Sequence, residues 1–269
     1  MQKIPLPREH GAWVMLFTPC ILGTLLAPQI ALHVVLLYIA ILGAFLARHP
    51  FIFLLKTRTH KNREAQRQHM TMWLALYGVV SMGAGALLLF AYQLTWLLYF
   101  AFAAVIGLGL DTWWHLKREG MSAKAEYAGV IAMSLSAPAA YYVASGTLPW
   151  QAFALCLLCI LYFGGSIFYV KLKVRTQPKA PCPVSTLQKL RAGKVNATYH
   201  LFALTLVSIL AALGTLPLWT PLAFLPVTIK AMWGTFQWQT KQELNLMRLG
   251  IYECVHALVF SVMIILTFA

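Results

Sequence analysis

The chain has 269 residues, of which 60% are hydrophobic and 10% are charged, and its formal net charge is +14. A soluble domain carries about 25% charged residues, so the composition excludes an ordinary soluble protein. Apolar runs of about 20 residues recur along the whole length, which predicts a polytopic helical membrane protein. We attribute the positive charge to membrane-flanking loops attracted to anionic membrane lipid, and we expect no nucleic-acid partner.

The apolar runs predict an all-α bundle of about nine transmembrane helices, forming a single transmembrane domain over residues 1–269. Proline inside the fifth span, at position 138, predicts a kink there. A basic segment, 48–69, follows the second span, and the longest polar loop, 171–194, follows the sixth. The expected spans are 11–27, 30–47, 70–92, 94–110, 123–146, 149–170, 195–214, 216–229 and 246–268.

All 21 lysines and arginines lie before the first span, in alternate connections or in the first three residues of the span that follows one, and the other connections carry none. The positive-inside rule therefore predicts a cytosolic N-terminus. The connections after spans two, four, six and eight are cytosolic on the same argument, and the C-terminus lies outside.

The last apolar segment contains Glu253 and His256. Residues three apart share one face of a helix, and ionisable groups at membrane depth are functional candidates by default. We expect these two to act in acid/base chemistry or hydrogen bonding, or else to form a buried structural pair. Nine other polar residues fall in the cytosolic half, which predicts a cytosol-facing cavity that binds substrate. They are Arg8, Glu9, His10, Arg48, His49, Asp111, Glu126, Lys171 and His200.

Plainer roles stay open for several of these residues. Asp111 can pair with Lys117, and Glu126 can pair with a neighbouring cation at the membrane surface. A single Glu-x-x-His does not make a di-metal site, which needs a second copy and further carboxylates. We therefore expect no metal site, and the sequence indicates no particular cofactor. The five cysteines are expected to be free thiols: Cys20, Cys156, Cys159, Cys182 and Cys254.

Two stretches resemble the YwiC-like family of bacterial integral membrane proteins. One is Pro-Arg-Glu-His-Gly-Ala-Trp at positions 7–13. The other is Arg-Leu-Gly at 248–250 with the downstream Glu253, His256-Ala257-Leu258 and Phe260. The likeness extends to Arg48-His49-Pro50 and Ser136-Ala137-Pro138. The resemblance implies a multi-pass protein of the bacterial cytoplasmic membrane, and it implies no particular reaction.

The number of spans and the long cytosolic loops also resemble the UbiA-type intramembrane prenyltransferases. That family holds magnesium with aspartate-rich motifs in the loops after helices two and six. Here residues 48–69 contain only one acid, Glu64, and residues 171–194 contain none. The resemblance therefore suggests a similar arrangement of helices without the diphosphate chemistry.

Four functions stay open. The first is binding or modifying a polyprenyl or quinone-like membrane lipid, with Arg8, His49 and Lys171 contacting the headgroup. The second is a small-solute or proton-coupled transporter that uses the buried acids and histidines as relays. The third is a haem- or metal-binding membrane subunit, with His10, His49, His200 or His256 as ligands. The fourth is an assembly protein without chemistry. Protein partners cannot be predicted from the sequence.

Overall fold

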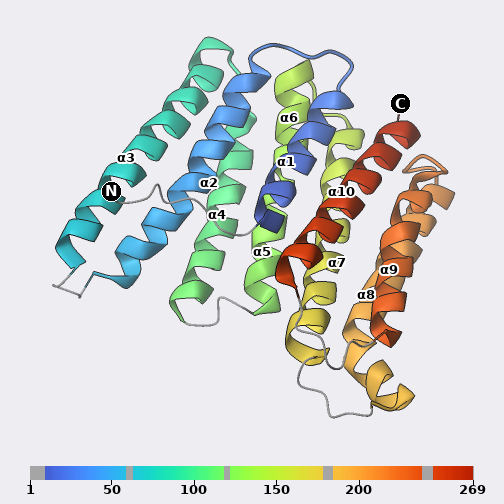
Figure 1. Cartoon of the computed structure of the whole chain (residues 1–269). Coiled ribbons are helices and arrows are strands. Elements are labelled where there is room, and N and C mark those ends of the chain that lie inside the picture. The colour runs from blue at the N-terminus through green and yellow to red at the C-terminus, as the bar shows by residue number, and fades with distance from the viewer. Residues whose placement is uncertain (1–9, 59–62, 118–121, 178–183, 238–244, 269) are drawn as a thin grey trace. The chain divides into compact units, whose positions relative to one another are not determined.

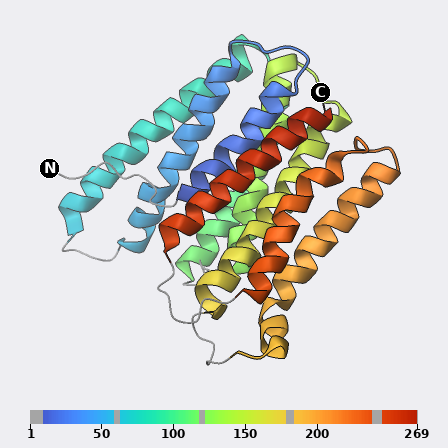
Figure 2. The same ribbon diagram turned by 45° about the vertical axis from the view of Figure 1, so that its right-hand side comes forward.

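The computed structural model describes residues 10–58, 63–117, 122–177, 184–237 and 245–268. Within these ranges the regular elements are all helical (Figures 1 and 2). Seven of the described helices are long and apolar enough to cross a membrane, which confirms the expected all-α multi-pass class. The chain divides into two compact units, Met1–Ala152 and Phe153–Ala269, here called unit 1 and unit 2. The expected single domain and the UbiA-like arrangement stay predictions.

Unit 1 is built from helices that pack in pairs. In it α2 and α3 lie side by side in both views, α1 packs on α6, and α4 packs on α5 (Figures 1 and 2). Helix α3 continues as a short π-helical segment, Leu87–Ala91. The helices are α1 His10–Leu25, α2 Val34–Lys56, α3 Glu64–Ala86, α4 Leu97–Leu116, α5 Ala123–Ser134 and α6 Ser136–Ser145.

The kink expected at Pro138 falls a few residues earlier. Helix α5 ends at Ser134 and α6 begins at Ser136, so the proline lies in the first turn of a new helix. A proline in the first turn removes an N–H that has no partner within the helix, so it is tolerated there. Helix α6 ends at Ser145 and is capped by Gly146, whose φ of +75° is the left-handed conformation that glycine adopts at helix C-termini.

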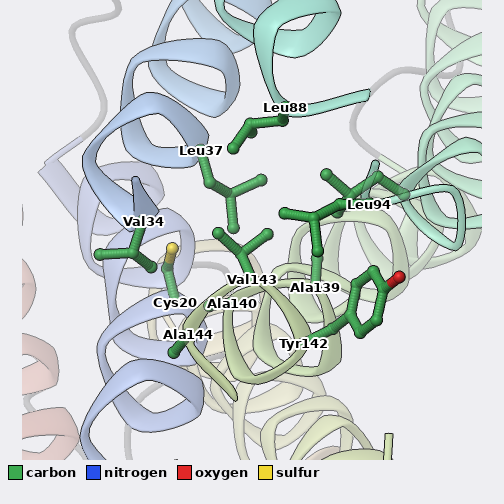
Figure 3. Close-up of a cluster of buried hydrophobic side chains, with 11 residues drawn as sticks. Cys20, Val34, Leu37, Leu88, Leu94, Ala139, Ala140, Tyr142, Val143 and Ala144 are labelled. Atoms are coloured by element: carbon green, nitrogen blue, oxygen red, sulfur yellow. The ribbon is translucent and has the colours of Figure 1, made fainter. Parts of the chain in front are cut away.

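The core of unit 1 lies where α6 meets α1, α2 and the end of α3 (Figure 3). Small side chains on α6 let α1 approach closely: a Cβ at Gly23 would overlap the backbone carbonyl of Ala137. Close contact through small residues is a common way to pack membrane helices. The buried cluster comprises Cys20, Val34, Leu37, Leu88, Leu94, Leu97, Ala139, Ala140, Tyr142, Val143 and Ala144.

Unit 2 contains most of α7 Trp150–Lys171, then α8 Thr186–Ala212, α9 Leu225–Phe236 and α10 Leu246–Phe268. Helices α8 and α9 lie side by side in both views (Figures 1 and 2). Helix α8 begins with a capping box, in which Ser185 and Gln188 satisfy each other's backbone N–H groups. A 12-residue helix rises about 18 Å, so α9 alone is shorter than the hydrocarbon core of about 30 Å.

The polar connections are shorter than the sequence suggested. Residues expected in loops extend α2 to Lys56 and start α3 at Glu64 and α8 at Thr186. Lysine, arginine and glutamine are good helix formers, so helices continue past the ends of their apolar runs. The eighth span is also displaced, because α9 runs to Phe236 and therefore contains Lys230.

Four of the five cysteines lie in the described ranges, and all four are free thiols as expected: Cys20, Cys156, Cys159 and Cys254. Cys182 lies outside the described residues.

Candidate functional site

An ion pair joins α9 to α10 inside unit 2. The Lys230 Nζ and Glu253 Oε1 atoms are 2.7 Å apart, and only 10% and 13% of the two side chains are exposed. The second carboxylate oxygen, Oε2, is also buried, and it has no hydrogen-bond partner among the described residues. A buried acceptor without a partner costs about 1–3 kcal/mol, so this oxygen requires an explanation.

The lysine of this pair also contacts an aromatic ring. Its Nζ lies 4.6 Å from the centroid of the Tyr169 ring, which α7 contributes, and the Lys173 Nζ lies 5.9 Å from the same centroid. Lys173 Nζ donates to the carbonyls of Gly234 and Gln237, at 2.9 Å each. A cation at these carbonyls satisfies and stabilises the C-terminus of α9. Helices α7, α9 and α10 are therefore tied together by two lysines.

Tyr162, about two and a half helical turns before the end of α7, has a buried side chain with an unpartnered hydroxyl in the described part of the chain. Its ring stacks on Phe260 of α10, with centroids 4.1 Å apart, and it meets Phe163 edge-on at 5.1 Å. The tyrosine is thus fixed by aromatic packing against α10, the helix that carries Glu253, and its hydroxyl is buried with it.

His200 of α8 is 3% exposed and lies against α7 at Gly165. A Cβ built on that glycine would be 2.8 Å from the histidine Nε2, so only glycine leaves space for the ring. The Nδ1 atom is 2.9 Å from the carbonyl of Asn196. A carbonyl only accepts, so Nδ1 donates and Nε2 of the neutral ring is an acceptor. Within the described ranges Nε2 has no partner.

Asn196, where α8 packs on α9, adds another buried acceptor. Asn196 Nδ2 donates to the Ala231 carbonyl at 3.1 Å and to Thr235 Oγ1 at 3.2 Å. Its Oδ1 is buried and has no partner among the residues described. A Cβ on Gly193 would overlap the Thr235 side chain, so glycine at that position lets the two helices come together.

These side chains form what we call the buried polar cluster, which four helices of unit 2 supply. Lys230 links Tyr169 to Glu253, and the carbonyl of the next residue on α9, Ala231, accepts from Asn196, whose own carbonyl contacts His200. The cluster combines a cation, aromatic faces and several unsatisfied acceptors. Its members are Tyr162, Tyr169, Asn196, His200, Lys230 and Glu253.

An apolar groove runs along α9, the helix that carries Lys230. Its volume is about 510 Å³, and its walls are almost entirely apolar. The groove is lined by Thr228, Ile229, Met232, Trp233, Phe236 and Gln237. An elongated hydrocarbon chain is the kind of ligand that fits such a surface.

The predicted pair Glu253 and His256 shares α10, but the two side chains have different partners. Glu253 pairs with Lys230, whereas the half-buried His256 has its Nδ1 2.8 Å from the Tyr252 carbonyl of its own helix. His200 belongs to the buried polar cluster. The catalytic assignment of Glu253 and His256 stays a prediction.

Unit 1 brings two other predicted residues together. The Arg48 Nε atom of α2 donates to Asp111 Oδ2 of α4 at 2.8 Å, and Nη2 of the same guanidinium also contacts this oxygen. The aspartate side chain is 5% exposed and the arginine 31%. Lys117, the alternative partner considered for Asp111, has its Nζ 4.6 Å from the centroid of the Trp113 ring.

The remaining predicted residues lie at helix ends. His10 is the first residue of α1, and Arg8 and Glu9 lie outside the described residues. His49 is exposed on α2, whereas Glu126 in the first turn of α5 and Lys171 at the end of α7 are half-buried. Among the described residues there is no group of three or more histidines, cysteines or acids placed to hold a metal ion.

Comparison with known proteins gives a family and no activity. An uncharacterised protein of Haemophilus influenzae is 24% identical over 263 residues, which is 98% of both chains. The uncharacterised protein YwiC of Bacillus subtilis is 26% identical over 260 residues, 96% of this chain and 95% of that one. No solved structure matches the chain. The family model described as YwiC-like protein matches residues 6–141, half of the sequence, and this multi-pass helical protein therefore belongs to the YwiC-like family.

Proposed function

We propose that unit 2 binds the headgroup of a polyprenyl or quinone-like membrane lipid at the buried polar cluster. The observation that carries this proposal is the Glu253 carboxylate. One of its oxygens pairs with Lys230, and the other is buried without a partner in the described part of the chain. An ion pair needs its remaining lone pairs satisfied to repay its desolvation, and a polar headgroup at this point would do so.

The composition of the cluster supports a hydroxylated headgroup. The Tyr162 hydroxyl offers a donor, and the second Glu253 oxygen offers an acceptor, neither with a partner among the described residues. Recognition sites for small molecules have this composition, with mostly apolar walls and a few placed polar groups. The groove on α9 supports the same proposal, because it offers an apolar surface for the tail on the helix that carries Lys230.

A proton-coupled transporter is the second candidate. The observation that favours it is the same buried ion pair together with His200, since ionisable residues at membrane depth also serve as proton relays. The two proposals differ in one measurable respect. A lipid-binding protein retains a defined lipid through purification, whereas a proton relay does not require one.

The charge distribution supports an orientation with the cluster nearer the cytosol. The lysines and arginines lie at the N-terminus and in or beside alternate connections of the sequence, and by the positive-inside rule this supports a cytosolic N-terminus and an external C-terminus in a bacterial cytoplasmic membrane. Labelling single cysteines at positions 2 and 269 in intact cells tests this orientation. The cysteine at position 269 should react with a membrane-impermeant maleimide, and the one at position 2 should not.

Lipid mass spectrometry after purification in mild detergent tests the binding proposal. The site variant is Lys230→Met/Glu253→Met, which keeps side-chain length and removes both charges. The matched control makes the same exchange at two exposed positions of unit 1, Lys124→Met/Glu64→Met. We expect a near-stoichiometric isoprenoid lipid in the wild type and the control, and its loss from the site variant. Bulk phospholipid alone in all three samples would contradict the proposal and favour the transporter.

A further inference from the structure

We infer that the buried polar cluster selects a headgroup that donates hydrogen bonds, so that a lipid quinol binds in preference to the quinone with the same ring and tail. This inference rests on the proposed function and specifies the chemical state of its ligand. Its basis is that the buried unpartnered atoms on Glu253, His200 and Asn196 are all acceptors.

The Glu253 Oε2 atom is an acceptor because it belongs to the carboxylate that pairs with the Lys230 ammonium, whose Nζ lies 2.7 Å from Oε1. An ionised carboxylate has lone pairs and no hydrogen, so Oε2 can only accept. A ligand carbonyl facing this oxygen would bring two acceptors together without a hydrogen between them.

The His200 Nε2 atom is an acceptor because the other ring nitrogen holds the hydrogen. The Asn196 carbonyl, 2.9 Å from Nδ1, requires a donor there. A doubly protonated ring would be a buried cation, and the carboxylate of the cluster already has Lys230 as its partner. Burying a charge without a counter-ion is costly, so the neutral ring with an accepting Nε2 is the favoured form.

The Asn196 side chain also presents an acceptor, its amide oxygen Oδ1. Its Nδ2 faces the Ala231 carbonyl and the Thr235 hydroxyl. Because the Ala231 carbonyl cannot donate, the amide nitrogen must face it, and this fixes the orientation of the whole group. Both amide hydrogens are then used, and Oδ1 is left as an acceptor.

A quinol and a quinone differ in what they offer to these atoms. Each quinol hydroxyl carries a hydrogen that can satisfy one acceptor, whereas both quinone oxygens only accept. The Tyr162 hydroxyl can donate to an oxygen of either form, so it does not discriminate between them. One hydrogen bond to a charged acceptor corresponds to about a tenfold to hundredfold difference in affinity.

Equilibrium binding to the full chain in lipid nanodiscs tests the inference. The two probes are a decyl-substituted benzoquinol, kept reduced under anaerobic conditions, and the benzoquinone with the same ring and tail. We expect the wild type to bind the quinol at least about tenfold more tightly than the quinone. Glu253→Gln places an amide that can donate at the same position, so the preference should fall by about tenfold. The exposed Glu64→Gln exchange should leave it unchanged.

The possible outcomes separate this inference from the proposed function. Equal or tighter binding of the quinone by the wild type, lost in Lys230→Met/Glu253→Met, would overturn the selectivity and leave lipid binding at the cluster intact. Failure of both probes to bind would overturn both. The wild-type comparison alone decides the selectivity, so the inference is tested even if an individual variant does not fold.

Discussion

Removing the Glu253 carboxylate alone should destabilise the protein more than removing its whole ion pair. The Lys230 Nζ and Glu253 Oε1 atoms are 2.7 Å apart, and about a tenth of each side chain is exposed. Breaking a pair this buried leaves an uncompensated charge and costs about 3–5 kcal/mol, whereas exposed pairs contribute about 0–1 kcal/mol. Glu253→Met should therefore lower the free energy of unfolding by about 3–5 kcal/mol.

The double variant should recover most of this loss. Lys230→Met/Glu253→Met removes both charges and keeps two flexible apolar side chains, a change that is often nearly neutral in buried pairs. Lys230→Met alone also loses the contact with the Tyr169 ring, which adds about 0.5–2 kcal/mol to its cost. A double-mutant cycle on the purified protein, with unfolding followed by circular dichroism in detergent, measures the coupling energy. We expect at least about 2 kcal/mol.

A coupling energy below about 0.5 kcal/mol would refute this reasoning, because that is the value of a solvent-exposed pair. Such a result would mean that water reaches both charges, and Glu253 Oε2 would then need no ligand to satisfy it.

Three further substitutions, the first with a matched control, should change stability or hydrogen exchange. Gly165→Ala should displace the His200 ring and lower stability by about 1–3 kcal/mol, measured by thermal unfolding. Gly83→Ala, where a Cβ meets nothing within 4 Å, is its matched control and should be neutral or stabilise α3 by up to about 1 kcal/mol. Lys173→Met should speed hydrogen exchange at the end of α9, because the Gln237 carbonyl loses the Lys173 ammonium and the Gly234 carbonyl keeps only the Gln177 amide as a side-chain donor. Arg48→Met should lower the free energy of unfolding by about 1–3 kcal/mol, because the buried Asp111 carboxylate loses the hydrogen bonds that it accepts from the guanidinium.

The helical membrane architecture could be predicted from the sequence because it depends on the length and polarity of each segment. Those properties are local, and each of the nine expected segments is helical in the described ranges. Helix ends were less predictable. Apolar runs mark where a helix meets hydrocarbon, whereas charged residues such as Lys230 continue the same helix beyond that run.

The candidate site was predictable only in part. Glu253 and His200 stood out because ionisable groups within apolar runs are rare. Lys230 did not, because its position at the end of a short apolar segment is that of an ordinary loop lysine. Tyr162 and Asn196 have no distinctive sequence signal, since their roles follow from packing against Phe260 and Ala231. Which helices meet is a tertiary property, and one sequence does not determine it.

Photo-crosslinking tests the central claim most directly. The probe is a quinol lipid with a diazirine beside the ring, activated on the full chain in nanodiscs, with labelled peptides identified by mass spectrometry. The account predicts labelling of unit 2 residues around Glu253 and His200, strongly reduced in Lys230→Met/Glu253→Met and unchanged in Lys124→Met/Glu64→Met. Labelling confined to unit 1, or equal labelling in all three proteins, would contradict it.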